Sequence, residues 1–435
     1  MGIKVCDALC GSGKTSACIR MMNERTDARF IFVTQFLTEV DRIKRCCASR
    51  DFCSPECDLP SRTKLEDIIT LLRERRNIAT THSLFLSYTD EVKSLVRDGG
   101  YILILDETVD TFNMSGLKIC DINMLKDHKI VQNENGYVEW AYTEYESDDY
   151  DGSGKFSTEV NLTKSKNLLE YDGKYLFWAI PPELFECFQE AYVLTYLFHA
   201  QLLRCFFEMY GFDYEFIGVR KLEGKYEFCS ADEMNRKRDL RGKIHILEHN
   251  KLNAIGSQRT DLSYSYYAFR EHADRDGFFE SLRKNLVNLF RNIFKAPAEE
   301  IMWTTFKEFR GRLSSKGFKN SFVTYNKRAS NDYANRKYLA YCVNNFMRPW
   351  EARYYREHGV NVDQDSYALS ILVQWIFRSA IRNDEEIWVY LPSARMRSLL
   401  KQWLENLAEG EDLKPVSYTA NEKRRRRRKC TKEGE

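Results

Sequence analysis

A group of small and hydroxyl residues around one lysine, near the start of the sequence, could bind phosphate. Residues 6–16 read Cys-Asp-Ala-Leu-Cys-Gly-Ser-Gly-Lys-Thr-Ser and follow the short, mainly β-branched run of residues 3–5. Gly11 and Gly13 would let backbone N–H groups turn inward around phosphate oxygens. Lys14 could reach the β- and γ-phosphates, and the Thr15 hydroxyl could ligate Mg²⁺. The loop residues expected to bind a nucleotide are Gly11, Ser12, Gly13, Lys14, Thr15 and Ser16.

Two adjacent carboxylates form the second candidate group. Residues 101–105 read Tyr-Ile-Leu-Ile-Leu and are followed directly by Asp106 and Glu107. Such an apolar run is typical of a strand buried on both faces of a parallel sheet, with the carboxylates at its end. Asp106 could hold Mg²⁺, and Glu107 could polarise the attacking water. Together with the Gly-rich loop, this pair predicts a Mg²⁺-dependent ATP hydrolase.

The residues around these groups indicate alternating strands and helices. A helix should follow the loop over residues 16–22, and a buried strand should cover residues 30–34, with a helix to about residue 47. This order indicates an α/β fold. Another buried strand is expected at residues 191–198, in which Thr195 could sense the γ-phosphate or simply cap a helix.

The length of 435 residues favours two or three domains. We expect a first domain over residues 1–198 and a second over residues 199–410, with a flexible basic tail at 411–435. The periodicity fades between about residues 113 and 174, which indicates an insertion late in the first domain, with an Asn-Gly hairpin turn at residues 135–136. For the second half we predict strands over 300–307, 320–326 and 387–392, and helices over 338–345, 366–381 and 395–407.

The apolar helix expected at residues 366–381 carries Gln374 and Arg378, with Arg382 just beyond. Their spacing of i, i+4 and i+8 would place the three side chains on one helix face. A solvated face would also show this spacing. The apolar neighbours of these residues favour a buried or interfacial anion.

Composition and charge restrict the class of protein. Hydrophobic residues make up 43% of the chain, which excludes wholesale disorder. No stretch approaches the ~18 apolar residues of a membrane span, and the phosphate loop leaves no room for a signal peptide. We therefore expect a cytoplasmic protein with reduced thiols. The spacing of Cys46, Cys47, Cys53 and Cys57 fits no zinc ribbon or finger, so loop cysteines are the favoured interpretation and a zinc site is the alternative.

The net charge of +2 gives no global basic field for nucleic acid. The run Arg424–Arg428 in the tail could bind nucleic acid electrostatically or could be a solvated, disordered segment. Any path for nucleic acid through the folded part must therefore be local.

With these motifs, the chain resembles superfamily 2 helicases of the DEAD/DEAH-like type, and most closely small helicase-like proteins of phages and mobile elements. Residues 8–15 resemble motif I with Ala8 in place of the usual first Gly, and residues 106–108 resemble motif II. Residues 194–196 stand where motif III is expected but lack Ser-Ala-Thr. Residues 328–333 resemble motif V, which would give Asn331 and Asp332 a coupling role beside Thr195. Gln374, Arg378 and Arg382 resemble motif VI, in which Arg378, with Arg382 beside it, would be the arginine finger.

The resemblance also implies a nucleic-acid path along motifs Ia, Ib and IV. The residues expected to contact it are Thr34, Thr80, Thr81, His82, Thr304 and Thr305. Hydroxyls at strand ends suit phosphates without reading sequence.

The resemblance implies an α/β fold of two tandem RecA-like domains with central parallel sheets, with ATP and Mg²⁺ as cofactors. The expected activity is that of an ATP-dependent helicase or translocase acting on nucleic acid, with DNA favoured over RNA and no membrane partner. The alternative is an ATPase switch that acts on a protein partner without nucleic acid. No segment upstream of the loop could read the base, so the specificity for the base stays open.

Overall fold

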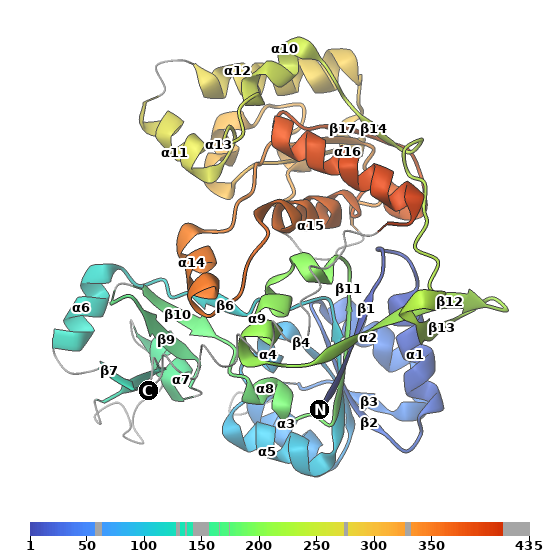
Figure 1. Ribbon diagram of the computed structural model, residues 1–435, viewed down its shortest axis with the longest axis vertical. Helices are drawn as coiled ribbons and strands as arrows, with labels where there is room; N and C mark the ends of the chain where they lie inside the picture. The colour runs from blue at the N-terminus through green and yellow to red at the C-terminus, as the bar shows by residue number, and fades with distance from the viewer. Residues whose placement is uncertain are drawn as a thin grey trace. The chain divides into compact units, whose positions relative to one another are not determined.

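The computed structural model describes residues 1–56, 63–127, 131–134, 137–141, 156–164, 166–173, 175–273, 277–326 and 332–411 (Figure 1). The chain divides into two compact units. The first contains Met1–Asp7, Gly13–Thr195 and Phe206–Ala231, and the second contains Ala8–Ser12, Tyr196–Cys205 and Asp232–Glu435. None of the helices in the described ranges combines the length and apolar character that a membrane span requires.

The first unit is built on an eight-stranded sheet with the order β13-β12-β1-β11-β5-β2-β4-β3. Every neighbouring pair is parallel except the hairpin of β12 and β13. The strands are β1 (Gly2–Asp7), β2 (Arg29–Thr34), β3 (Phe52–Cys53), β4 (Asn77–Thr81), β5 (Tyr101–Asp106), β11 (Glu190–Thr195), β12 (Tyr214–Leu222) and β13 (Lys225–Ser230). Phe30, Leu103 and Val193 are fully buried, as expected of central strands covered on both faces. The predicted parallel sheet is confirmed.

Helices connect the parallel strands of this unit. They are α1 (Lys14–Glu24), α2 (Leu37–Cys46), α3 (Lys64–Arg73), α4 (His82–Phe85), α5 (Asp90–Gly99) and α8 (Glu183–Glu186), and α9 (Leu202–Tyr210) leads toward β12. Local capping fixes where they begin. Thr63 and Glu66 form a capping box at α3, and the Thr89 side chain caps α5.

The predicted insertion forms a separate small antiparallel sheet with the order β6-β10-β9-β8-β7 (Figure 1). Its elements are β6 (Phe112–Met114), α6 (Ile119–Asp127), β7 (Val131–Glu134), β8 (Tyr137–Trp140), α7 (Ser157–Lys164), β9 (Leu168–Tyr171) and β10 (Tyr175–Ala179). A core that includes Ile122, Leu125 and Leu168 stabilises it. The predicted hairpin is present as the antiparallel pair β7–β8, although its Asn-Gly turn lies outside the described residues.

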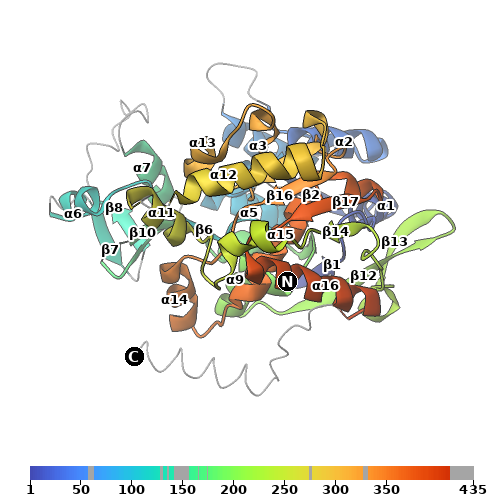
Figure 2. The same cartoon turned by 90° about the horizontal axis from the view of Figure 1, so that it is seen from above.

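The second unit contains a four-stranded parallel sheet with the order β14-β17-β16-β15. The strands are β14 (Ile244–Ile246), β15 (Ile301–Thr304), β16 (Tyr338–Tyr341) and β17 (Ile387–Tyr390). The helices are α10 (Asn250–Asn253), α11 (Tyr264–His272), α12 (Phe278–Asn288), α13 (Arg310–Leu313), α14 (Pro349–Glu357), α15 (Gln364–Ile376) and α16 (Ala394–Glu409). Helices α12 and α13 pack against each other (Figure 2). Trp303, Trp375 and Tyr341 are fully buried in the core of this unit.

Three predictions for the second half were wrong in part. Residues 338–341 form strand β16 rather than a helix, because parallel neighbours on both sides bury this short apolar run. Residues 320–326 form no strand, and Phe322 makes only an isolated bridge with Trp303. The helix predicted over 366–381 ends at Ile376.

The division into units also differs from the boundary expected at residue 198. Strand β12 pairs with β1, so this later segment belongs to the first sheet. Conversely, Tyr196–Cys205 groups with the second unit, where the Trp403 indole donates to the Tyr196 hydroxyl at 2.9 Å. Non-local pairing of this kind leaves no local signal in a sequence. The tail from residue 412 onward, with its arginine run, lies outside the described residues.

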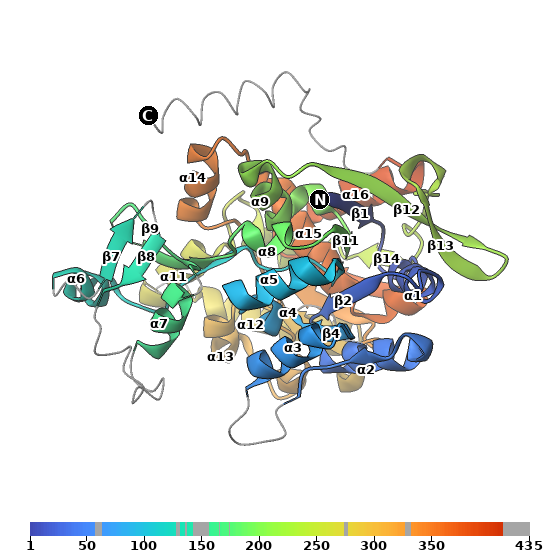
Figure 3. The same ribbon diagram turned by 90° about the horizontal axis from the view of Figure 1, so that it is seen from below.

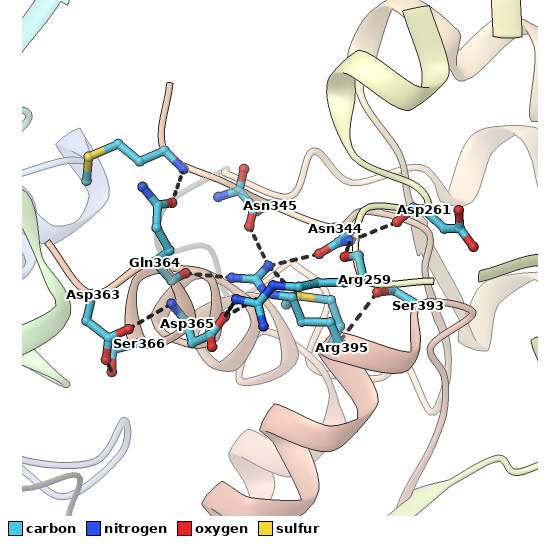
Figure 4. Close-up of polar contacts among 12 residues, drawn as sticks. Arg259, Asp261, Asn344, Asn345, Asp363, Gln364, Asp365, Ser366, Ser393 and Arg395 are labelled. Carbon is cyan, nitrogen blue, oxygen red and sulfur yellow. Dashed lines mark hydrogen bonds and ion pairs between the residues drawn. The ribbon is translucent and has the colours of Figure 1, made fainter. Parts of the chain in front are cut away.

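The buried Arg395 ties together three segments of the second unit (Figure 4). Its Nε donates to the Asp365 carboxylate at 2.7 Å, and Nη2 donates to the Gln364 carbonyl at 2.7 Å. Its Nη1 donates to the Asn344 side chain and to the Asn345 carbonyl, each at 2.8 Å. The beginnings of α15 and α16 are therefore fixed to the segment that follows β16. A guanidinium is suited to this task because its donors spread in a fixed plane.

Replacing Arg395 with Met should destabilise the second unit by about 2–4 kcal/mol, because several buried acceptors would lose their donor. Arg259 provides a matched control. It pairs with the same Asp365 carboxylate at 3.5 Å, but its side chain is 68% exposed. Arg259→Met should therefore change stability little. Urea unfolding of both variants measures their free energies of unfolding. If both variants lose the same stability, Arg395 does not stabilise the contact between these three segments.

Candidate nucleotide site

The loop between β1 and α1 has the backbone conformation of a phosphate cradle. Gly11 and Gly13 adopt left-handed φ angles of 80° and 92°, which residues with a Cβ rarely adopt. The Ser12 N–H donates to the Leu9 carbonyl at 3.1 Å and closes a turn within the loop. Helix α1 begins after Gly13, a residue without a side chain that could cap the helix start. Such a helix start favours an anion.

The carboxylates lie where the sequence predicts them, beside the first turn of α1. The Thr15 hydroxyl donates to Oδ1 of Asp106 at 3.3 Å. The Thr195 hydroxyl, at the end of β11, donates to Oε2 of Glu107 at 3.4 Å. Residues from α1, β11 and the end of β5 therefore converge at the carboxyl ends of the parallel strands, which is the edge where open α/β sheets bind ligands.

The backbone at the second carboxylate is strained. Glu107 has a φ of 65°, an uncommon value for a residue with a side chain, and its N–H donates to the Leu194 carbonyl at 2.9 Å. His82 lies 3.1 Å from the carbonyl of Asp106 through Nε2, and since a carbonyl only accepts, Nε2 carries the hydrogen. These two contacts fix the turn that aims Asp106 and Glu107. Residues with a side chain that adopt such a positive φ are often found at functional sites.

The electrostatics of the site favour a cation. Burial, followed by the neighbouring Glu107 carboxylate, raises the pKa of Asp106 to about 7, and the Lys14 ammonium and the Thr15 hydroxyl oppose this rise only in part. A hydroxyl in contact with a carboxylate is a donor set that suits Mg²⁺. Thr15 and Asp106 are the residues that would hold this ion. Within the described residues, no cluster of three or more His, Cys, Asp or Glu could hold a metal, and Cys57 lies outside them.

The predicted nucleic-acid contacts of the first unit lie at the ends of neighbouring strands. Thr34 and Thr80, on β2 and β4, are each 3% exposed, and Thr81 is half-buried. His82 is also buried and contacts the Asp106 backbone. The structure therefore places His82 beside the backbone of Asp106, in the candidate nucleotide site.

The predicted contacts of the second unit need correction. Thr304 and Thr305 are 0% exposed, so neither hydroxyl has a surface on which to bind a phosphate. They lie at the end of β15 and are buried in the core of the second unit, not on the surface groove that was expected. Of the coupling residues expected nearby, Asn331 lies outside the described residues and Asp332 lies in an exposed turn.

The expected shared helix face of the motif VI residues is not formed. Gln374 lies on α15, but the helix ends before Arg378, and Arg382 lies in a following 3₁₀ turn (Ala380–Asn383). Arg378 is 3% exposed, whereas Arg382 is exposed. The chain turns at Phe377 because residues 377–381 pack into the core of the unit. The i, i+4, i+8 spacing of Gln374, Arg378 and Arg382 therefore does not place the three residues on one helix.

One neighbour of the loop was missed from the sequence. The ring of Tyr226, on β13, contacts Gly13 so closely that an added Cβ would lie 2.2 Å from it. Gly224 is a residue that suits the second position of a two-residue hairpin turn and is a weak signal for the hairpin. Nothing local in the sequence indicates that this hairpin lies beside β1.

The raised pKa of Asp106 predicts an unusual pH dependence for the metal-free protein. The folded state binds a proton more tightly than the unfolded state does, so stability should fall as pH rises from about 4 to about 7. Asp106→Asn should remove this dependence and raise stability at pH 8 by roughly 1–2 kcal/mol, since partial exposure screens the charge. Thermal unfolding in EDTA at pH 5 and pH 8 measures the effect. If Asp106→Asn changed the melting temperature by the same amount at pH 5 and at pH 8, the raised pKa of Asp106 would not be the cause of the pH dependence.

The chain is similar to known proteins in sequence and in fold. The chain is 37% identical over 411 residues to the "SPbeta prophage-derived uncharacterized protein YonV" of Bacillus subtilis (strain 168), covering 93% of this chain and 99% of that protein. Residues 238–404 match the family model of the YonV C-terminal Rossmann-like domain. Among solved structures, S. tokodaii Xpd4 aligns with a TM-score of 0.43 at 12% identity over 96% of both chains, and an XPD helicase with 0.44 at 11% over 95% of both. The chain belongs to the family of the prophage protein YonV.

Proposed function

We propose that the protein hydrolyses ATP at the site formed by α1, β5 and β11 and uses the energy as a helicase or translocase on nucleic acid. The observation that supports this most is the hydrogen bond from Thr15 to Asp106. It brings the hydroxyl of the phosphate loop to the carboxylate at the end of β5, in the arrangement that a Mg²⁺–nucleotide complex requires. ATP and nucleic acid are both present in the cytoplasm, where we propose that the protein acts.

Each residue of the site has a distinct role in this proposal. The N–H groups of the loop and the Lys14 ammonium bind the phosphates, and Lys14 is held in a buried position at 7% exposure. Bound Mg²⁺ would neutralise charge on the phosphate oxygens. Glu107 orients and polarises the attacking water. Thr195 holds Glu107 in place, and this contact could transmit the state of the nucleotide to β11.

A second candidate function is an ATPase switch that acts on a protein partner. Two observations favour keeping it. The buried Thr304 and Thr305 remove two expected nucleic-acid contacts, and the insertion has a sheet of its own that could serve a partner. Both functions need the same nucleotide chemistry and differ only in what stimulates it.

The rate of ATP hydrolysis in the presence of single- and double-stranded DNA and RNA separates the two functions. A helicase or translocase should be stimulated by at least one of the four, and DNA is expected to act more strongly than RNA. Lys14→Ala should abolish hydrolysis in every condition, because it removes the cation that contacts the β- and γ-phosphates. If none of the four changes the rate of the wild-type protein, the switch becomes the better description.

Arg378 remains the proposed arginine finger, because its position after Gln374 resembles motif VI. An arginine finger contributes about 10³–10⁵ in rate, so Arg378→Ala should reduce kcat strongly while the affinity for ATP stays within about threefold. Arg382→Ala is the matched control, because it removes the other arginine of the motif, and it should have little effect if Arg378 is the finger. Steady-state hydrolysis, nucleotide binding and melting temperature should be measured together. Wild-type turnover by a folded Arg378→Ala protein would remove the assignment.

A further inference from the structure

The hairpin of β12 and β13 lies on the side of β1 that faces away from the carboxylates. In the sheet, β11 and β5 follow β1 on one side, and β12 and β13 follow it on the other. Strand β12 pairs with β1 from Tyr214 to Ile217 and then continues to Leu222. At about 3.3 Å per residue, the hairpin extends roughly 16 Å past that pairing. It therefore reaches beyond the strand ends, alongside the phosphate loop.

One aromatic ring of this hairpin contacts the phosphate loop directly. A Cβ added to Gly13 would lie 2.2 Å from Cδ1 of Tyr226, so the ring packs on the backbone of this glycine. Strand β13 also packs along α1, as Figure 3 shows, and Arg20 of α1 pairs with Glu227 at 3.1 Å. These contacts fix the position of the Tyr226 ring relative to the start of the helix.

The surroundings of Tyr226 leave it accessible to a ligand. Its side chain is half-buried, and its partner across the hairpin is the exposed Lys221. The Lys221 ammonium lies 5.5 Å from the centre of the ring. A long, exposed lysine is mobile, so it can leave the ring when a better partner arrives. The site therefore combines an aromatic ring and a cation next to the phosphate loop.

The position of the γ-phosphate determines whether the phosphate end or the base end of the nucleotide lies near the Tyr226 ring. The γ-phosphate must face Asp106 and Glu107, because the metal and the attacking water act there. These carboxylates follow β5, on one side of β1. A nucleotide bound by the loop between them therefore directs its other end, the ribose and base, toward the opposite side of β1. The Tyr226 ring and Lys221 lie on that side.

We propose that Tyr226 is the platform on which the nucleotide base stacks and that Lys221 contacts the ribose or α-phosphate. This assignment rests on the proposed nucleotide site and adds the part of it that binds the base. Stacking reads the size of the base and not its hydrogen-bonding edge. The site should therefore prefer purine over pyrimidine nucleotides and discriminate weakly between ATP and GTP.

Binding of ATP and of inorganic tripolyphosphate, both with Mg²⁺, tests the assignment, because only ATP carries a base. Base–aromatic stacking contributes about 1–3 kcal/mol, so Tyr226→Leu should weaken ATP binding roughly 5- to 100-fold. The leucine still packs on Gly13, and tripolyphosphate affinity should stay within about twofold. Tyr226→Phe retains the ring and should bind both ligands like the wild type. Isothermal titration calorimetry measures each affinity.

The other outcomes are equally clear. If Tyr226→Leu loses affinity for ATP and tripolyphosphate by the same factor, the ring supports the loop and does not contact the base, and the assignment is overturned. It is also overturned if neither affinity changes.

If Tyr226→Leu fails to fold, a weaker purine preference of Tyr226→Ser in competition between GTP and CTP gives the same test. Wild-type protein that binds tripolyphosphate and ATP equally well would contradict the base platform alone, whereas binding neither would contradict the proposed function itself.

Discussion

The hydrogen bond between Thr15 and Asp106 depends on the order of strands in the first sheet. The phosphate loop follows β1 and Asp106 ends β5, and these strands are separated by β11. The parallel register places Cys6, Leu194 and Asp106 in one row across the three strands. The three strands therefore end within one residue of each other, and the residues at their ends lie close together. A shift of one residue in β5 would move its side chains to the opposite face and break this contact.

The same arrangement places a carboxylate where it is costly to ionise. Asp106 is partly removed from water next to a second carboxylate, and a pKa raised to about 7 is the consequence. Nearby groups offset this cost only in part, since Thr15 and Lys14 oppose the rise without cancelling it. A protein that only needed stability would gain from an apolar residue at this position. The strained φ of Glu107 adds a second cost at the same turn. The cost of ionising Asp106 and the backbone strain at Glu107 would both be explained if the turn binds a cation and activates water.

The parts of the site that could be predicted are those that local chemistry determines. The Gly-rich loop and the Asp-Glu pair each carry their function in adjacent residues, and the rule that parallel strands end at one edge brings them together. Prediction failed where distant pairing decides the structure. Residues 338–341 and the hairpin β12–β13 adopt their positions because of strands far away in the sequence. Helical spacing alone also could not show that α15 ends before Arg378, since an apolar chain can be buried in a helix or in a turn.

The three small residues of the phosphate loop are under different constraints, and this explains why one of them departs from the usual pattern. Gly13 needs a positive φ of 92° and has no room for a Cβ, because the Tyr226 ring occupies that space. Gly11 needs a positive φ of 80°, but nothing lies within 4 Å of a Cβ placed there. Ala8, in place of the usual first glycine, is absent from the residues with positive φ in the described chain, and its methyl group is buried at 3% exposure. A side chain at position 8 therefore costs no backbone strain and adds apolar contact, whereas at position 13 it would displace the hairpin as well as distort the loop.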